Sequence, residues 1–176
     1  MFGGWFLPAV LAGLSLFAVR GVCAGEAGKK ASRKAILLVA FGTSVPEAQR
    51  AYDAVDRAVK NAFVGVEVRW AFTSSTIRTK LAKQGKHLDS PEMALVKMMG
   101  EGFSHIAALS LHVIPGIDFH HFHTNCRLFS QMAGGIKRIA VARPLLTSHE
   151  DMVQVAASLI KRIPQGRKPG DAVLYV

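Results

Sequence analysis

The stretch KAILLVAFGTSVP, residues 34–46, decides the fold. Its apolar run from Ala35 to Phe41 is typical of a strand that is covered on both faces, and such strands belong to parallel sheets. A glycine and two hydroxyl residues follow, and then Pro46, which favours the first turn of a helix. The stretch therefore predicts a buried parallel strand that ends in a polar loop and leads into a helix.

Further strand signals alternate with helical ones along the chain, which indicates a parallel α/β sheet. The predicted strands are Lys34–Phe41, Val66–Thr73, His105–His112, Ile136–Ala142 and Ala172–Val176. With 176 residues the chain can bury one such core and has no room for two large domains. We expect a three-layer fold, a parallel sheet with helices on both of its faces.

The first residues resemble a signal peptide. Trp5–Val19 is a short apolar run, and the small residues Val22 and Ala24 resemble a signal-peptidase site. We expect cleavage after Ala24, a basic leader over residues 25–33, and a periplasmic protein. Two alternatives stay open: an uncleaved anchor, and a lipoprotein attached through Cys23, for which the preceding residues are a poor match.

Local signals also mark the helices. Predicted helix starts are Pro46, Ser90-Pro91, Asp118 as the cap of a helix that runs to about Ala133, and Ser148.

The cysteine content argues against a disulfide. Removal of the signal peptide, which contains Cys23, would leave Cys126 as the single cysteine, so no internal disulfide is possible. We expect this cysteine to be a buried helix residue.

The net charge of the chain indicates what kind of ligand it binds. The formal net charge is +10, and cations are spread along the chain. No aromatic and basic residues interleave, and an exported protein rarely meets nucleic acid, so we expect no nucleic-acid partner. A polyanionic small molecule fits the charge better.

Polar residues follow the predicted strands where open parallel sheets bind their ligands, at the carboxyl ends. The first two strands are followed by candidate binding residues, which are Gly42, Thr43, Ser44, Thr73, Ser74 and Arg78. Glycine lets a ligand approach the backbone, amides at a helix start favour an anionic group, and a cation pairs with carboxylates. An ordinary capped turn and a solvated helix face are the alternatives for these two loops.

The third strand ends in His112 and leads to a histidine-rich segment, DFHHFH, residues 118–123. His120 and His123 share a helix face, and His121 points elsewhere. Imidazole is the commonest ligand of borderline transition metals, but no carboxylate-spaced zinc pattern is present. A histidine flanked by aromatic residues, such as His120, is also a candidate axial ligand of a haem, provided that its apolar neighbours face that ring.

Four blocks of the sequence resemble the anaerobic-pathway sirohydrochlorin cobaltochelatases, which belong with ferrochelatase to the class II chelatases. The blocks are LLVAFGTS at residues 37–44, RWAFTS at 69–74, SLHVIPG at 110–116 and PLLTSHED at 144–151. They occur in the family's order and cover about Lys34 to Val176.

The resemblance implies a bilobal protein with a tetrapyrrole in the cleft between two similar α/β lobes, of which residues 34–176 are the N-terminal lobe. It implies insertion of Co²⁺, or of Fe²⁺, into sirohydrochlorin without ATP. In the family the histidine that binds this metal follows the strand corresponding to Ala172–Val176, so the resemblance places no ligand of the catalytic cobalt within this chain. We expect the lobe to be inactive alone and the full-length form to be a homo-oligomer.

Metallation replaces two pyrrole protons with one dication, so the site needs a base. The resemblance places an acidic residue shortly after the Ser-Leu-His block, and Asp118 occupies that position, as Asp where relatives have Glu. We expect Asp118 to accept a proton, His112 to assist it, and the polar loops to form the floor of the cleft. The alternative function is an exported module that binds haem or a metal without turnover.

Overall fold

The computed structural model describes residues 32–166, 168, 170 and 172. The strands are β1 (Arg33–Ala40), β2 (Glu67–Phe72), β3 (Phe103–Ser110) and β4 (Arg138–Val141). The helices are α1 (Pro46–Ala62), α2 (Ser75–Ala82), α3 (Pro91–Gly100), α4 (Ile117–Gln131) and α5 (His149–Ile160). The predicted signal peptide and, apart from Ala172, the predicted fifth strand lie outside the described residues. Among the described helices, none has the length and apolarity that crossing a membrane requires.

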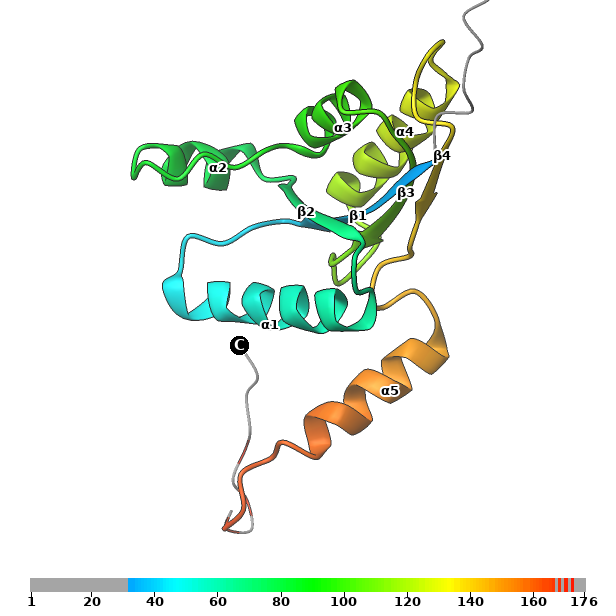
Figure 1. Ribbon diagram of the computed structural model, residues 1–176. Coiled ribbons are helices and arrows are strands. Elements are labelled where there is room, and N and C mark those ends of the chain that lie inside the picture. The colour runs from blue at the N-terminus through cyan, green and yellow to red at the C-terminus, as the bar shows by residue number, and fades with distance from the viewer. Residues whose placement is uncertain (1–31, 167, 169, 171, 173–176) are drawn as a thin grey trace, which may run out of the picture. The chain divides into compact units, whose positions relative to one another are not determined.

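The strands form one parallel sheet in the order β2-β1-β3-β4 (Figure 1). The central strand β1 pairs with β2 on one side and with β3 on the other. α3 and α4 cover one face, and α1 lies against the opposite face. The prediction of a three-layer α/β fold is therefore confirmed, and the described strands differ from the predicted ones by a few residues at their ends.

The main core lies between the sheet and the helices α3 and α4. Leu37 and Val39 of β1 are fully buried there against Leu95 of α3 and Phe122 of α4. Cys126 also belongs to this core, as predicted, and burial raises the pKa of its thiol to about 12. Each fully buried aliphatic side chain contributes roughly 2 kcal/mol to stability, so this layer holds the sheet in place.

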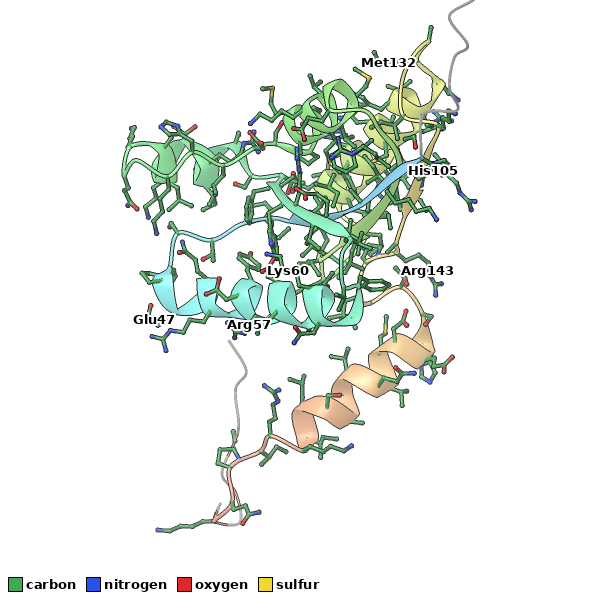
Figure 2. The ribbon with its side chains drawn as sticks, in the orientation of Figure 1. Glu47, Arg57, Lys60, His105, Met132 and Arg143 are labelled. Carbon is green, nitrogen blue, oxygen red and sulfur yellow. The ribbon has the colours of Figure 1, made fainter. Side chains whose placement is uncertain are left out.

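The opposite face is covered less completely. Tyr52 of α1 packs against Trp70 and Phe72 of β2, with ring centroids 5.4 and 5.8 Å apart, and Asp56 accepts a hydrogen bond from the Trp70 indole at 2.9 Å. Charged residues such as Arg57 lie on the side of α1 that faces away from the sheet (Figure 2). Over β3 and β4, however, Ala107 and Ala140 remain exposed and line an apolar cleft of about 620 Å³.

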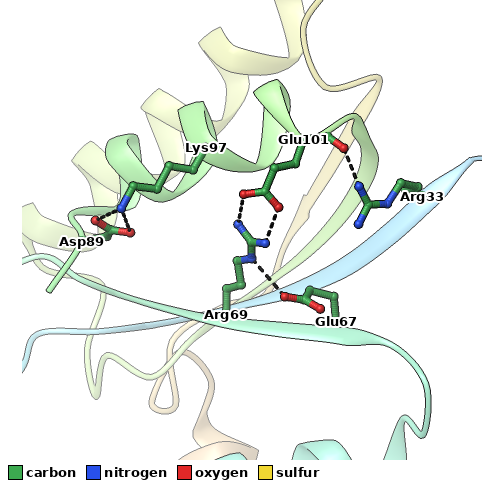
Figure 3. Close-up of polar contacts among 6 residues, drawn as sticks. All are labelled: Arg33, Glu67, Arg69, Asp89, Lys97 and Glu101. Carbon is green, nitrogen blue, oxygen red and sulfur yellow. Dashed lines mark hydrogen bonds and ion pairs between the residues drawn. The ribbon is translucent and has the colours of Figure 1, made fainter.

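The amino-terminal edge of the sheet is tied together by charged side chains (Figure 3). Arg69 of β2 forms a two-pronged ion pair with Glu101, which follows α3, and also contacts Glu67. The guanidinium groups of Arg33 and Arg69 lie 4.1 and 5.3 Å from the centroid of the Phe103 ring. Arg33, predicted as the last residue of a solvated leader, is thus the first residue of β1 and packs on β3.

Helix starts follow the local signals with one exception. Ser90 and Ser148 cap α3 and α5 as predicted, each accepting a hydrogen bond from an amide of the first turn. Asp118 does not cap α4, and that prediction is wrong. The cap is Gly116, whose carbonyl accepts the first helical hydrogen bond from the His120 amide at 3.1 Å, so Asp118 lies inside the first turn.

Candidate functional site at the carboxyl edge of the sheet

The loops that follow β1, β2 and β3 meet at the carboxyl edge of the sheet. The Thr73 amide donates to the Ala40 carbonyl at 2.9 Å, and the Leu111 amide donates to the Val39 carbonyl at 2.8 Å. The Thr73 hydroxyl and His112 Nε2 lie 3.2 Å apart. The structure therefore gathers the residues that the sequence predicted at the ends of three strands, because parallel strands all end at one edge.

Gly42 allows the first loop to pass close to α2. Its φ angle is +105°, in the region that favours glycine. A Cβ atom here would lie 3.2 Å from the Ile77 Cγ2 atom, so a side chain would crowd α2 as well as strain the backbone. The next residue, Thr43, turns its hydroxyl into its own loop and accepts from the Val45 amide at 3.1 Å. Ser44 is half-buried in the same loop.

Two candidate binding residues that follow β2 form hydrogen bonds within the loop and helix that follow this strand. The Ser74 hydroxyl caps α2 by accepting from the Ile77 amide at 3.3 Å, and Ser74 is buried. Arg78 donates from one terminal nitrogen to the carbonyls of Phe72 and Thr73, the latter at 2.8 Å. Both residues are at the predicted edge, and these hydrogen bonds fix where β2 ends and where the Thr73 side chain stands.

His112 is buried and engaged at both ring nitrogens. Its Nδ1 atom lies 2.9 Å from the Ser110 hydroxyl and its Nε2 atom 3.2 Å from the Thr73 hydroxyl. The edge of the Phe119 ring packs against the imidazole at a centroid distance of 6.4 Å. Burial lowers the pKa of His112 below its ordinary value of 6.5, and the negative charge of Asp118 opposes that shift only in part. The imidazole is therefore neutral at neutral pH.

A polar cavity of about 420 Å³ opens beside these residues. Thr73 lines it from the end of β2, and Asp118 and His121 line it from the first turns of α4. Glu92 and Asn125 line it from α3 and α4 and are joined by a hydrogen bond of 2.7 Å. The cavity thus places two carboxylates, a hydroxyl and an imidazole around one space.

Glu92 remains ionised in this cavity. Burial raises its pKa, but hydrogen bonds from Ser90, its own amide and Asn125, together with the charge of Arg78, outweigh burial and hold the pKa below its usual value. Glu92 and Asn125 were not predicted as site residues, and His121 was expected only to point away from His120 and His123. The spacing of Asp118, His121 and Asn125 was an available signal, because residues three and seven positions apart share one helix face.

The chain was compared with known proteins. A family model described as cobalt chelatase (CbiK) matches residues 34–176. The sirohydrochlorin cobaltochelatase CbiKC of Nitratidesulfovibrio vulgaris is 38% identical over 145 residues, which are 82% of this chain and 51% of that protein. The sirohydrochlorin cobaltochelatase of Salmonella typhimurium is 31% identical over 138 residues, 77% of this chain and 51% of that protein.

The chain belongs to the cobalt chelatase (CbiK) family. The resemblance to class II chelatases drawn from the four sequence blocks is therefore confirmed. The chain spans about half the length of the curated relatives that it matches.

The described residues of this edge offer groups that can accept protons. Among residues 32–166, 168, 170 and 172, no three or more His, Cys, Asp or Glu side chains are grouped so that they could hold a metal ion. Asp118 and His112 are groups that can take up protons, and the Thr73 hydroxyl can pass them on. The chemistry that the described edge supports by itself is proton transfer beside a bound ligand.

The histidines of α4 divide as the helix period predicts. His120 and His123 are exposed and both lie close to the Phe119 ring, with centroid distances of 5.6 and 5.9 Å. His121 points away from them and lines the polar cavity. The exposed pair lies outside that cavity, so any ligand it binds would occupy a different place.

Proposed function

We propose that this chain supplies the first lobe of a sirohydrochlorin cobaltochelatase and that its carboxyl edge binds the tetrapyrrole and accepts its pyrrole protons. The observation that carries the proposal is the meeting of Thr73, His112 and Asp118 at one edge in a chain of the cobalt chelatase family. The cobalt ion is a substrate in this reaction, and its imidazole ligand would come from the second lobe. Both curated relatives named above carry the name sirohydrochlorin cobaltochelatase.

Proton acceptance is the step that this lobe would perform. Insertion of a divalent ion displaces two pyrrole protons, so a neighbouring base lowers the barrier. The Asp118 carboxylate lines the polar cavity, is half-buried and forms no ion pair with another described residue. It is therefore free to take a proton from the macrocycle.

Unpaired cations beside the same edge would attract the carboxylates of the substrate. Lys80 of α2 and Lys83, which follows the last residue of that helix, are exposed and have no ion pair within the described part of the chain. Lys97 on α3, in contrast, is held by Asp89 at 2.7 Å. Sirohydrochlorin is rich in carboxylates. A lysine without an acidic partner can bind such a carboxylate without breaking an ion pair within the protein.

An absorbance titration of the purified chain with sirohydrochlorin tests ligand binding, and a cobalt-insertion assay tests turnover. We expect Lys80→Ala with Lys83→Ala to weaken binding and to reduce its salt dependence, and the matched control Lys97→Ala to leave both unchanged. We expect negligible insertion by the chain alone and insertion when a second lobe is joined to it. Absence of binding by the wild-type chain, or full-length activity from the chain alone, would refute the proposal.

A second candidate function is binding of haem through His120. This imidazole is exposed, lies beside the Phe119 ring and follows the exposed apolar residue Ile117 by three positions on α4. An apolar surface next to a free imidazole suits axial ligation of a haem. We expect a Soret shift on haem titration that His120→Ala abolishes and His87→Ala, at another exposed histidine, leaves unchanged; a shift that survives His120→Ala excludes this ligand.

We also propose that the first 24 residues direct export to the periplasm and are then removed. The support is their composition, a short apolar run followed by small residues before Gly25. N-terminal sequencing of the protein recovered from a periplasmic fraction should start at Gly25 or close to it. Recovery of the uncut chain from the cytoplasm would exclude export. The full-length form is expected to be a homo-oligomer, which light scattering would test.

A further inference from the structure

Three side chains at the carboxyl edge form one continuous hydrogen-bonded chain. The Thr73 hydroxyl lies 3.2 Å from His112 Nε2, and His112 Nδ1 lies 2.9 Å from the Ser110 hydroxyl. Thr73 is only half-buried and lines the cavity that holds Asp118, whereas His112 and Ser110 are 9% and 5% exposed. This series of hydrogen bonds therefore leads from the cavity into the protein, and Thr73 is its accessible end.

A relay through Thr73 requires one arrangement of the protons. In that arrangement the Ser110 hydroxyl oxygen, which also accepts from the His112 amide at 3.4 Å, accepts from the ring Nδ1–H. The neutral imidazole then carries its proton on Nδ1 and leaves Nε2 as an acceptor for the Thr73 hydroxyl. A proton that reaches the Thr73 oxygen from the cavity can push the hydroxyl proton on to Nε2.

We propose that His112 accepts one of the two pyrrole protons through the Thr73 hydroxyl, while the Asp118 carboxylate accepts the other. This inference rests on the proposed chelatase function. The balance is complete: the macrocycle loses two N–H protons and gains Co²⁺, Asp118 becomes a carboxylic acid, and His112 becomes an imidazolium. In the relay the pyrrole N–H breaks as the Thr73 oxygen takes its proton, and the Thr73 O–H breaks as Nε2 takes the next.

The surroundings of His112 suit a proton acceptor that is unprotonated at the start of each turnover. Burial lowers its pKa, so the ring is unprotonated at neutral pH, and the nearby Asp118 carboxylate, while it is still ionised, favours the imidazolium. Two further charged groups lie at this end: Glu92, which lines the same cavity, and Arg78 of α2, whose guanidinium donates to the Thr73 carbonyl and so positions Thr73. The Phe119 ring packs against the imidazole.

Nitrogen NMR of the imidazole tests the arrangement on the chain itself, without turnover. We expect the ¹⁵N shifts of His112 to report the Nδ1–H tautomer, and Thr73→Val to move the Nε2 resonance while Thr79→Val, at an exposed threonine of α2, leaves it in place. A ring protonated on Nε2 would overturn the relay, because no lone pair would face Thr73. This result is independent of whether the protein inserts cobalt.

Cobalt insertion by the lobe joined to a second lobe tests the proton transfer. We expect Thr73→Val to lower kcat about a hundredfold with little change in KM, and Thr73→Ser to restore most of the rate, because serine keeps the hydroxyl. Thr79→Val should leave kcat unchanged, and the solvent deuterium effect on kcat should shrink in Thr73→Val. Thr73→Val with wild-type kcat would overturn the relay alone, whereas no insertion by the wild-type assembly would overturn the proposed function with it.

Discussion

The two edges of the sheet use charge in opposite ways. At the amino edge Arg69 is paired with Glu101 and Glu67 (Figure 3). Two guanidinium groups also lie over the Phe103 ring there. At the carboxyl edge Asp118 has no ion-pair partner among the described residues, and the ring nitrogens of His112 lie within hydrogen-bonding distance of two hydroxyl groups. Paired charges stabilise a structure, whereas unpaired titratable groups beside a cavity are available for chemistry. The comparison separates the end of this lobe that ion pairs stabilise from the end that we propose to be its reactive edge.

The largest expected effect is at the reactive edge. Asp118→Asn keeps the shape of the side chain but removes the base, so we expect kcat for cobalt insertion by the assembled enzyme to fall about 10²- to 10³-fold. The melting temperature should not change, because no described ion pair is lost. Asp53→Asn, at an exposed carboxylate of α1, is the control. A variant of Asp118 with wild-type kcat would remove the contrast between the edges.

At the stabilising edge, the corresponding change is Phe103→Ala. Phe103 is 4% exposed and packs beneath two guanidinium groups, so we expect a loss of about 3–4 kcal/mol in the free energy of unfolding. Phe103→Leu keeps most of the volume and should cost less than about 1.5 kcal/mol. Urea denaturation measures both. Tetrapyrrole affinity at a temperature where both variants are folded should stay the same; a weaker affinity would mean that the edges are coupled.

Ser74→Ala asks whether a hydroxyl at the reactive edge has a structural role. Because this side chain caps α2, we expect a loss of about 1 kcal/mol in stability and little change in ligand affinity. Ser74→Asp retains a capping acceptor and should recover most of the stability. Thermal unfolding and absorbance titration give the two quantities, and a large loss of affinity in Ser74→Ala would make Ser74 a ligand contact as well.

The smallest effect concerns a carboxylate near the reactive edge whose role is structural. Hydrogen bonds from the side chains of Ser148 and Thr147, and from their amides, lower the pKa of Asp151 to about 2 from 3.8. A lowered folded-state pKa stabilises the fold above pH 3.8, and this stabilisation is lost as the pH falls toward 2. We expect Asp151→Asn to melt below wild type at pH 6, and the difference to shrink as the pH approaches 2. A difference that does not depend on pH would contradict this assignment.

The sequence was sufficient to predict most elements of the fold. The buried run from Ala35 was confirmed as the central parallel strand, and Pro46, Ser90 and Ser148 marked helix starts correctly, because these signals are local. The start of α4 was predicted wrongly. Aspartate is a common capping residue, so Asp118 was expected to cap the helix. The helix begins instead at Ile117, and Gly116 is its cap.

The site was predicted in part. Thr73 and His112 were expected at one edge, since parallel strands end together, and the structure places their side chains within hydrogen-bonding distance. The cavity formed with Glu92 and Asn125 was not predicted, because it depends on the packing of α3 against α4. Arg78 was expected to contact a ligand, and the hydrogen bonds that it donates to the end of β2 were not foreseen.

The sequence by itself determined the parallel sheet, the order of its elements and the edge at which polar groups gather. Apolar runs, caps and turn residues act over short distances along the chain, so the sequence alone predicts their effect. Only the tertiary structure decided which of those groups bond to each other. It places His112 between Thr73 and Ser110, and it pairs Arg69 with Glu101 while Asp118 has no ion pair among the residues that the structure describes. The physical reason is that a hydrogen bond or an ion pair needs atoms within about 3–4 Å, and residues far apart in sequence reach that distance only when the helices and strands pack.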